Sequence, residues 1–136
     1  MWLVFIYSKT IVVTILFLIS VSPCPILAGT LDRTQYSADQ IRSMVVSEAR
    51  QMHFPVALAL AVADAESNFD ENAESHKGAR GIMQIMPATA VGEYGIPPDY
   101  LWNPRINIRL GLHFLKRLVN LYEGRTDLAL SYYNGG

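Results

Sequence analysis

The expected fold follows from one stretch, Val56-Ala57-Leu58-Ala59-Leu60-Ala61-Val62-Ala63, which is apolar at every position. It comes directly after Pro55, a residue that suits the first turn of a helix. Because no side of such a helix is polar, we predict that it is buried on all sides and that it ends near Glu66-Ser67-Asn68. A buried strand is the competing interpretation, but the four alanines and the length of the segment favour a helix.

The segments before and after this stretch predict two further helices. Ser37-Ala38-Asp39-Gln40 is a capping box, and it begins an amphipathic helix over residues 38–53. Pro87 can begin a short helix that stops by Gly95. Residues 68–86 then form a long connection that contains two glycines.

The last third of the chain predicts two more helices after a loop over residues 95–98. Asn103-Pro104 supplies the N-cap and first residue of a helix that ends at Gly124. Thr126 or Asp127 caps the final helix. No segment shows a convincing strand alternation, although residues 76–86 could form a small irregular hairpin. We therefore predict an all-α, mainly helical fold.

Length and composition exclude several classes of protein. The 136 residues suit one domain, and 11 basic against 12 acidic residues argue against general nucleic-acid binding. A hydrophobic share of 51% argues against disorder. A single cysteine forms no internal disulfide, and His53, His76 and His113 show no metal-ligand spacing. We expect neither a metal nor a cofactor.

Residues 1–28 resemble a secretory signal peptide. They carry one charge, Lys9, followed by an apolar run from Ile11 to Val21 that is short for a membrane-spanning helix. We predict cleavage after Ala28, which leaves residues 29–136 as a periplasmic or secreted domain. The competing interpretation is an uncleaved membrane anchor that begins at Trp2, so membrane contact is expected only through this segment.

One carboxyl group, that of Glu66, lies at the end of the most apolar predicted helix. Apolar surroundings favour the neutral form of a carboxyl and raise its pKa, so that it can donate a proton near neutral pH. A Glu at a helix end that simply meets solvent is the competing interpretation. Asp64 is two residues away and points to another side of the helix, so the sequence shows no paired carboxylate.

Four blocks of sequence around Glu66 occur in a fixed order. They are Glu66-Ser67-Asn68-Phe69, then residues 75–90 with the core Gly81-Ile82-Met83-Gln84-Ile85-Met86-Pro87, then Asn107-Ile108-Arg109-Leu110-Gly111, and finally Ala129-Leu130-Ser131-Tyr132-Tyr133-Asn134-Gly135-Gly136. This set resembles the catalytic domain of soluble lytic transglycosylases, which are related to goose-type lysozymes. The resemblance implies a lysozyme-like single domain over residues 29–136. The small size and the predicted signal peptide are most like those of members that accompany secretion or conjugation machines.

The resemblance implies a reaction in which Glu66 is the only catalytic acid and base. Glu66 protonates the oxygen of the β-1,4 bond between N-acetylmuramic acid and N-acetylglucosamine in peptidoglycan. The C6 hydroxyl of the muramoyl sugar attacks its own C1, which gives a 1,6-anhydro product without water. No second carboxylate is needed for this chemistry.

The same resemblance assigns substrate-binding roles to five further residues. Ser67 follows the acid, Met83 and Gln84 match residues that line the saccharide groove, and Tyr133 and Asn134 match a pair that faces the acid. The competing interpretations are that Met83 fills the core and that Tyr133 is a core aromatic with an exposed hydroxyl.

The chain ends at the fourth block, whereas domains of this family usually continue with a further segment. We therefore expect a domain truncated at its C-terminus. Two alternative functions follow: a muramidase that uses water, and a catalytically inactive peptidoglycan-binding or assembly protein.

Overall fold

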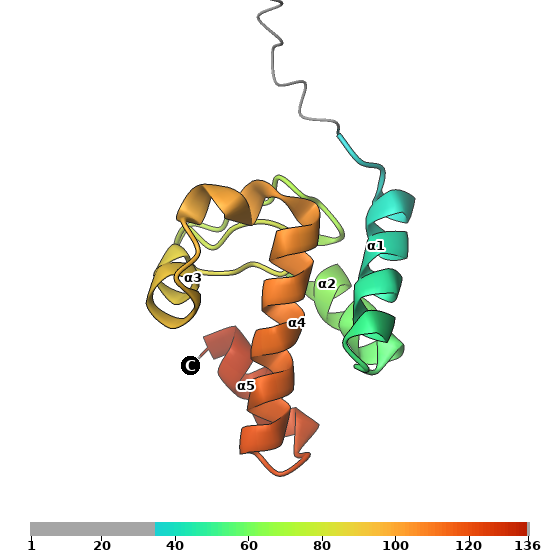
Figure 1. The fold of residues 1–136 in the computed structure, drawn as a ribbon, viewed down its shortest axis with the longest axis vertical. Helices are drawn as coiled ribbons and strands as arrows, with labels where there is room; N and C mark the ends of the chain where they lie inside the picture. Colours follow the sequence, from blue (N-terminus) through green and yellow to red (C-terminus); the bar gives the residue numbers. More distant parts are fainter. Residues whose placement is uncertain (1–34, 136) are drawn as a thin grey trace, which may run out of the picture. The chain divides into compact units, whose positions relative to one another are not determined.

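Helices account for most of residues 35–135, which are the part of the chain that the computed structural model describes (Figure 1). In chain order they are α1 (Ala38–Gln51), α2 (Val56–Ser67), α3 (Pro87–Tyr94), the 3-10 helix η1 (Pro98–Trp102), α4 (Pro104–Leu121) and α5 (Thr126–Gly135). The described residues contain no strand, so the all-α prediction is confirmed. The predicted signal peptide or anchor and its cleavage site lie outside the described residues.

The helix ends agree with the sequence signals in most places. Ser37 and Gln40 form the predicted capping box, and the Asn103 side chain accepts a hydrogen bond of 3.1 Å from the amide of Ile106 at the start of α4. Gly95 ends α3 in the left-handed conformation, with φ of 64°. Two predictions near these ends were wrong, because Pro98 begins η1 inside the predicted loop and Thr126 is already the first residue of α5.

The connection over residues 68–86 contains isolated bridges in place of the possible hairpin. Arg80 pairs with Glu74 on one side and with Ile85 on the other, both antiparallel. The loop after Arg80 turns back tightly, since the amide of Gln84 donates to the carbonyl of Gly81 at 3.0 Å. The pairing stops after single residues because Gly81 and Gln84 both have positive φ.

The prediction that α2 is buried on all sides was wrong. Ala59, Val62 and Ala63 are buried, whereas Ala57, Ala61 and Ala65 are exposed along another side. An alanine carries little apolar area, so its exposure to water costs little. The apolar character of α2 therefore identified the helix correctly but not the extent of its burial.

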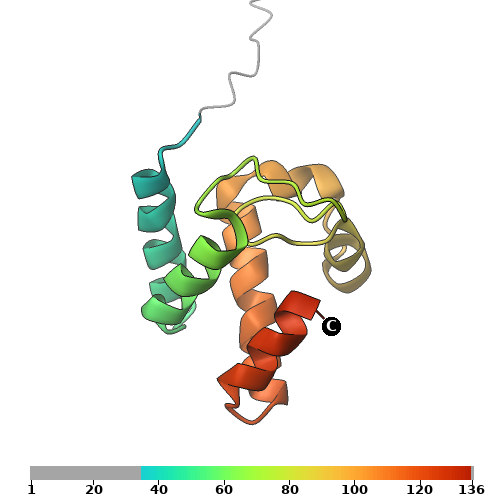
Figure 2. The ribbon, with the colours of Figure 1, turned by 180° about the vertical axis from the view of Figure 1, so that it is seen from behind.

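Helix α4 is the centre of the packing. In Figure 1 it lies in front of α2, with α1 to one side and α3 to the other. In the opposite view of Figure 2, α2 and α5 lie in front of α4. A buried carboxylate, that of Glu48 on α1, forms ion pairs with Arg105 and Arg109 of α4. Breaking such a buried pair is costly, so these contacts help to fix α1 against α4.

Gly111 allows α4 to approach the loop that contains Met83. A β-carbon built at Gly111 would lie 2.4 Å from Cβ of Met83, closer than van der Waals contact allows. We predict that Gly111→Ala lowers the free energy of unfolding by about 1–3 kcal/mol through overpacking. Gly92, where a β-carbon would meet no atom within 4 Å, is the control. Urea denaturation measures both, and an equal loss in Gly92→Ala would contradict the explanation.

No helix among the described residues combines the length and apolar character that crossing a membrane requires.

Candidate active site

Glu66 lies in the last turn of α2, next to a sharp change of chain direction. Asn68 and Phe69 both have positive φ, of 51° and 61°, and the amide of Asn68 donates to the carbonyl of Asp64 at 2.8 Å. Phe69 is buried and lies under the guanidinium of Arg42 of α1, 4.3 Å from its ring centroid. The turn after Glu66 is therefore anchored to the core, and the position of Glu66 is fixed by the fold.

The carboxyl of Glu66 is half-buried and lacks a charged partner. Among the described residues it forms neither a hydrogen bond nor an ion pair. Burial raises the pKa of Glu66 above its ordinary value of 4.5, because the charged form loses hydration that no protein group replaces. A carboxyl of this kind can stay protonated at a higher pH than an ordinary glutamate side chain in water, as a general acid requires.

This environment predicts a pH-dependent stability. The folded protein binds the Glu66 proton more tightly than the unfolded chain, so stability is lost as the pH rises from 4.5 through the raised pKa. We expect Glu66→Gln to raise the melting temperature near neutral pH and to leave it unchanged below pH 4.5. Asp64→Asn, at an exposed position of the same helix, is the control. A lower melting temperature of Glu66→Gln at neutral pH would contradict this explanation.

Tyr133 of α5 lies close enough to Glu66 for the two groups to interact electrostatically. Its hydroxyl donates a hydrogen bond of 2.8 Å to the carbonyl of Met83. Burial, the nearby charge of Glu66 and then Tyr94 raise the pKa of Tyr133 well above its usual range. Since its one proton is committed to Met83, the Tyr133 oxygen can act toward Glu66 only as an acceptor.

The loop over residues 81–84 connects α2 and α5 through its carbonyl groups. The Ser67 hydroxyl donates to the carbonyl of Ile82 at 2.8 Å, and the Tyr133 hydroxyl donates to that of Met83. The Met83 side chain is fully buried. This differs from the expectation that it lines a groove, because the side chain fills the space that Gly111 leaves in the core.

The remaining two candidate residues differ in their surroundings. The side-chain amide of Gln84 donates both of its hydrogens within the loop, to the carbonyls of Ala73 at 3.1 Å and Gly81 at 2.9 Å. Only the side-chain oxygen of Gln84 is therefore free to bind a ligand. Asn134 is exposed on α5, next to Tyr133 in the chain.

Sequence reasoning missed the importance of Asn107, a fully buried residue of α4. Its side-chain oxygen accepts from the amide of Met83 at 2.8 Å, and its amide donates to the carbonyls of Arg80 at 2.8 Å and Leu101 at 2.9 Å. A polar residue on the apolar face of an amphipathic helix was the signal that could have revealed it. Asn107 holds the loop whose carbonyls bind Ser67 and Tyr133.

The described residues contain no group of three or more His, Cys, Asp or Glu side chains that could bind a metal ion. The candidate site therefore consists of a protonatable carboxyl, a phenol and the backbone of one loop.

Comparison with known proteins identifies the family. The Transglycosylase SLT domain profile matches residues 43–136, so the chain belongs to this family. Curated relatives include the membrane-bound lytic murein transglycosylase C of Cronobacter sakazakii, which is 33% identical over 108 residues. They also include the soluble lytic murein transglycosylase of Escherichia coli, which is 34% identical over 89 residues.

Solved structures show the same fold. An inactive glutamate-to-glutamine mutant of the lytic transglycosylase Slt from Pseudomonas aeruginosa matches with a TM-score of 0.62 and 35% identity. The 70-kDa soluble lytic transglycosylase in complex with bulgecin A matches with a TM-score of 0.61 and 30% identity. These matches confirm the prediction of an all-α, lysozyme-like fold.

The chain corresponds to only part of each relative. The alignments cover 68% of this chain and 30% of the Cronobacter protein, and 60% of this chain and 14% of the Escherichia coli protein. The structural matches cover 70% and 69% of this chain and 16% of each solved chain.

Proposed function

We propose that the protein is a peptidoglycan lytic transglycosylase that cleaves the β-1,4 bond between N-acetylmuramic acid and N-acetylglucosamine. The observation that carries this proposal is the half-buried, unpaired Glu66 beside Tyr133, in a chain that belongs to the SLT family. The names of the curated relatives, which are lytic murein transglycosylases, support the same substrate and reaction.

In the first step, protonated Glu66 gives its proton to the glycosidic oxygen. The bond between that oxygen and C1 of the muramoyl sugar breaks, and the N-acetylglucosamine unit leaves with a free hydroxyl. Burial favours the neutral starting form of Glu66, and the Tyr133 oxygen can accept a hydrogen bond from it.

In the second step, the C6 hydroxyl of the same muramoyl sugar attacks C1. The Glu66 carboxylate takes the hydroxyl proton, which closes the 1,6-anhydro ring and restores the acid. Atoms and charge balance without water, and no second carboxylate is needed. Asp64, the nearest acid along α2, is exposed two residues away, so we assign it no role in the reaction.

The other candidate residues either support the loop beside Glu66 or bind the glycan. Ser67 and Tyr133 fix the loop beside Glu66 through their hydrogen bonds to Ile82 and Met83. The free oxygen of Gln84 and the exposed amide of Asn134 are suited to the N-acetyl and hydroxyl groups of the glycan. Met83 contributes through its backbone carbonyl.

We further propose that the protein acts outside the cytoplasm, as residues 29–136 released by the predicted signal peptide. Local cell-wall opening during assembly of a secretion or conjugation apparatus fits its small catalytic domain. This part of the proposal rests on the sequence of residues 1–28 and on the resemblance to small specialised members of the family.

Removal of the Tyr133 hydroxyl tests its role toward Glu66. We expect Tyr133→Phe to lower kcat about tenfold, the effect of one lost hydrogen bond of ~1.4 kcal/mol. If the Tyr133 oxygen accepts a hydrogen bond from protonated Glu66 in the glycan complex, as proposed, its removal should also move the alkaline limb of the pH–rate profile to lower pH. Tyr132→Phe, on the exposed side of α5, is the control. A lower rate with an unmoved profile would show that Tyr133 acts only by holding the loop at Met83.

Analysis of the products tests the proposed function as a whole. Purified peptidoglycan is digested with the protein, and the released muropeptides are identified by mass spectrometry. Anhydro-muramoyl ends would support the proposal, and reducing ends would identify a muramidase. If circular dichroism shows that the protein is folded and it binds the glycan without releasing any product, a binding or assembly protein would be favoured.

A further inference from the structure

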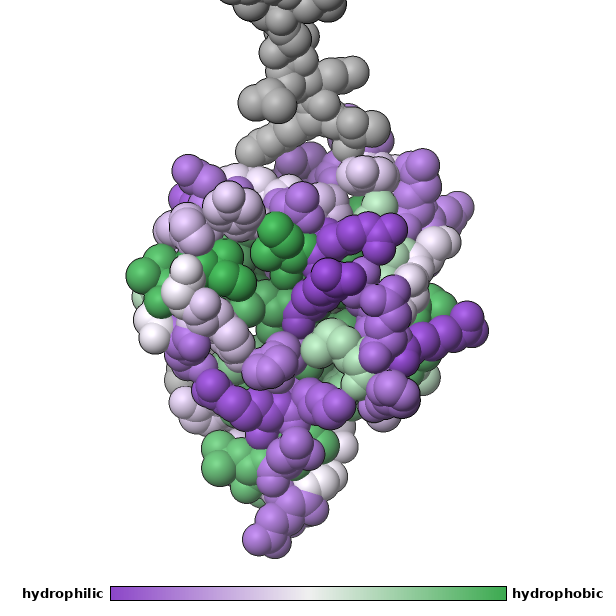
Figure 3. Space-filling model, in the orientation of Figure 1, coloured by the Kyte–Doolittle hydropathy of each residue, from purple (hydrophilic) through white to green (hydrophobic). Residues whose placement is uncertain are grey.

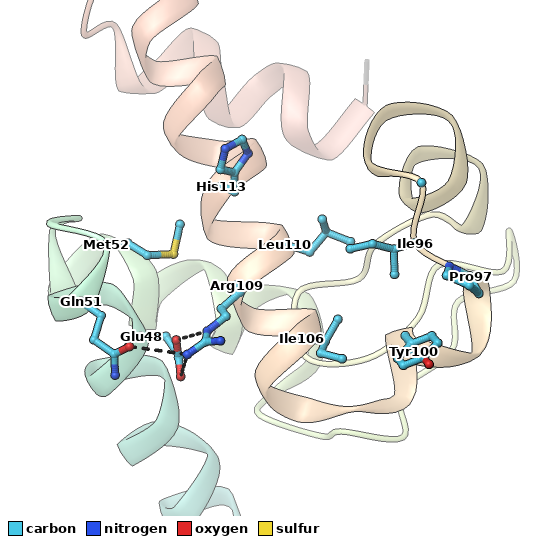
Figure 4. A pocket seen from close by; sticks show the side chains of 11 residues that line it. Glu48, Gln51, Met52, Ile96, Pro97, Tyr100, Ile106, Arg109, Leu110 and His113 are labelled. Atoms are coloured by element: carbon cyan, nitrogen blue, oxygen red, sulfur yellow. Dashed lines mark hydrogen bonds and ion pairs between the residues drawn. The ribbon is translucent and has the colours of Figure 1, made fainter.

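A concave surface lies on the side of α4 away from α2 and α5. It is a groove of about 730 Å³ between α1, α4 and the segment that leads into η1 (Figure 4). Apolar side chains from all three parts line it, namely Met52, Ile96, Pro97, Tyr100, Ile106 and Leu110. We call it the α4 groove. None of the candidate active-site residues lines it.

Different residues of α4 face this groove and the candidate active site. Asn107, Gly111 and Phe114 face the site, since they contact Met83 or Tyr133. Ile106 and Leu110 of the same helix face the groove. Helix α4 lies in front of α2 in the view of Figure 1, whereas α2 and α5 lie in front of α4 in the view of Figure 2. A molecule bound in the groove would therefore leave the glycan site accessible.

The edge of the α4 groove carries more positive than negative charge. Arg105 and Arg109 share a single carboxylate, that of the buried Glu48, which leaves one positive charge in excess. Past Met52 the groove continues into a smaller cavity of about 360 Å³, which Lys116 and Arg117 line. Lys116 donates to the carbonyl of Met52 at 2.8 Å and has no acidic partner among the described residues.

The other cation at this end, Arg117, already has an acidic partner. Arg117 pairs with Glu93 of α3, and its side chain is 52% exposed. The remaining excess is therefore one charge near Arg109 and one at Lys116, on either side of His113. In the orientation of Figure 3, apolar residues lie beside the hydrophilic side chains that cross this face.

We propose that the α4 groove binds an acidic amphipathic helix of a partner protein. The apolar side chains of such a helix would fill the groove, and carboxylates along one edge would meet the unmatched charges of α4. A concave surface fits a helix better than a flat membrane, which could contact its edges but not its floor. The bound partner would hold the enzyme while the opposite face acts on glycan.

Binding of designed peptides tests this proposal on the full chain. The probe is a synthetic helical peptide with one leucine face flanked by glutamates, and its counterpart carries lysines in place of the glutamates. We expect the acidic peptide to bind at least about tenfold more tightly, with an affinity that falls as salt is added. Equal affinity for both peptides, or binding of neither, would overturn the proposal.

Vesicles of phosphatidylglycerol provide the third arm of the experiment. If the protein binds them through the groove but does not bind the acidic peptide, the surface is a membrane contact and the proposal is wrong.

Two substitutions with matched controls locate the binding surface. Tyr100→Ala, at a side chain that is 53% exposed in the groove, should weaken binding of the acidic peptide by about tenfold or more. Tyr132→Ala, at a residue that is 47% exposed on α5, should leave it unchanged. Arg117→Ala should weaken binding more than Arg125→Ala, since both arginines pair with one nearby acid but only Arg117 lies at the groove. Equal effects of a variant and its control would contradict the proposed location.

Discussion

Glu66→Gln is expected to lower the rate of glycan cleavage by at least about a thousandfold. The amide has nearly the same shape as the carboxyl but can neither give a proton to the glycosidic oxygen nor take one from the C6 hydroxyl. Both steps of the proposed reaction therefore fail together. Release of anhydro-muropeptides per unit time measures the loss, and the Slt structure from Pseudomonas aeruginosa, an inactive glutamate-to-glutamine mutant, agrees with an essential glutamate in that protein.

The control for this substitution is Asp64→Asn, which removes an exposed carboxyl from the same helix. It should retain nearly all of the activity. Glycan binding by Glu66→Gln should also be retained, since the fold around residue 66 does not depend on a bond to its side chain. Activity of Glu66→Gln within tenfold of the wild type would exclude Glu66 as the acid.

Asn107→Leu is expected to lower the free energy of unfolding by about 3 kcal/mol or more. Leucine has a similar size, but it leaves the Met83 amide and the Leu101 carbonyl without the partner that Asn107 provides. The Arg80 carbonyl loses one of its two hydrogen bonds and keeps the one from the amide of Ile85. Each buried backbone group that loses its hydrogen bond costs about 1–3 kcal/mol. Chemical denaturation, monitored by circular dichroism, measures the change.

Activity under conditions where the variant is still folded gives a second readout. The loop that Asn107 holds carries the carbonyls that fix Ser67 and Tyr133, so the rate should fall as well. Asn120→Leu, at an exposed position of α4, is the control and should change stability by less than about 0.5 kcal/mol. Equal stability of Asn107→Leu and the wild type would show that the loop is held by other contacts.

The sequence was sufficient to predict the helices with clear end signals. The capping box at Ser37 and the Asn103-Pro104 pair each act over one helical turn, so their effect is visible within a few residues of sequence. The 3-10 helix η1 was missed because the two adjacent prolines were interpreted as loop residues, although the second of them begins the helix.

The burial of individual side chains depends on tertiary packing and could not be predicted in the same way. Ala57 and Ala61 are exposed although they belong to the most apolar stretch, since no neighbouring element covers them among the described residues. The Met83 side chain is buried because Gly111, 28 positions further along the chain, leaves room for it. The spacing of apolar residues along the sequence predicts neither the exposure of these alanines nor the burial of Met83.

In the candidate site, too, some features could be predicted from the sequence and others depend on tertiary contacts. Glu66 could be selected from the sequence, since it ends an apolar helix and matches a family motif. The acceptor role of Tyr133 required the observed hydrogen bond to Met83, and the role of Asn107 required three contacts with segments that are distant in sequence. The surroundings of Glu66 therefore depend on where Tyr133 and Asn107 lie in the fold, which the sequence alone does not show.

Digestion of peptidoglycan in water labelled with heavy oxygen tests the central claim most directly. If the C6 hydroxyl attacks C1 and Glu66 transfers the proton, the muramoyl products carry anhydro ends without heavy oxygen. Products with heavy oxygen at C1 would show that water is the nucleophile, and would contradict the proposed transglycosylase reaction.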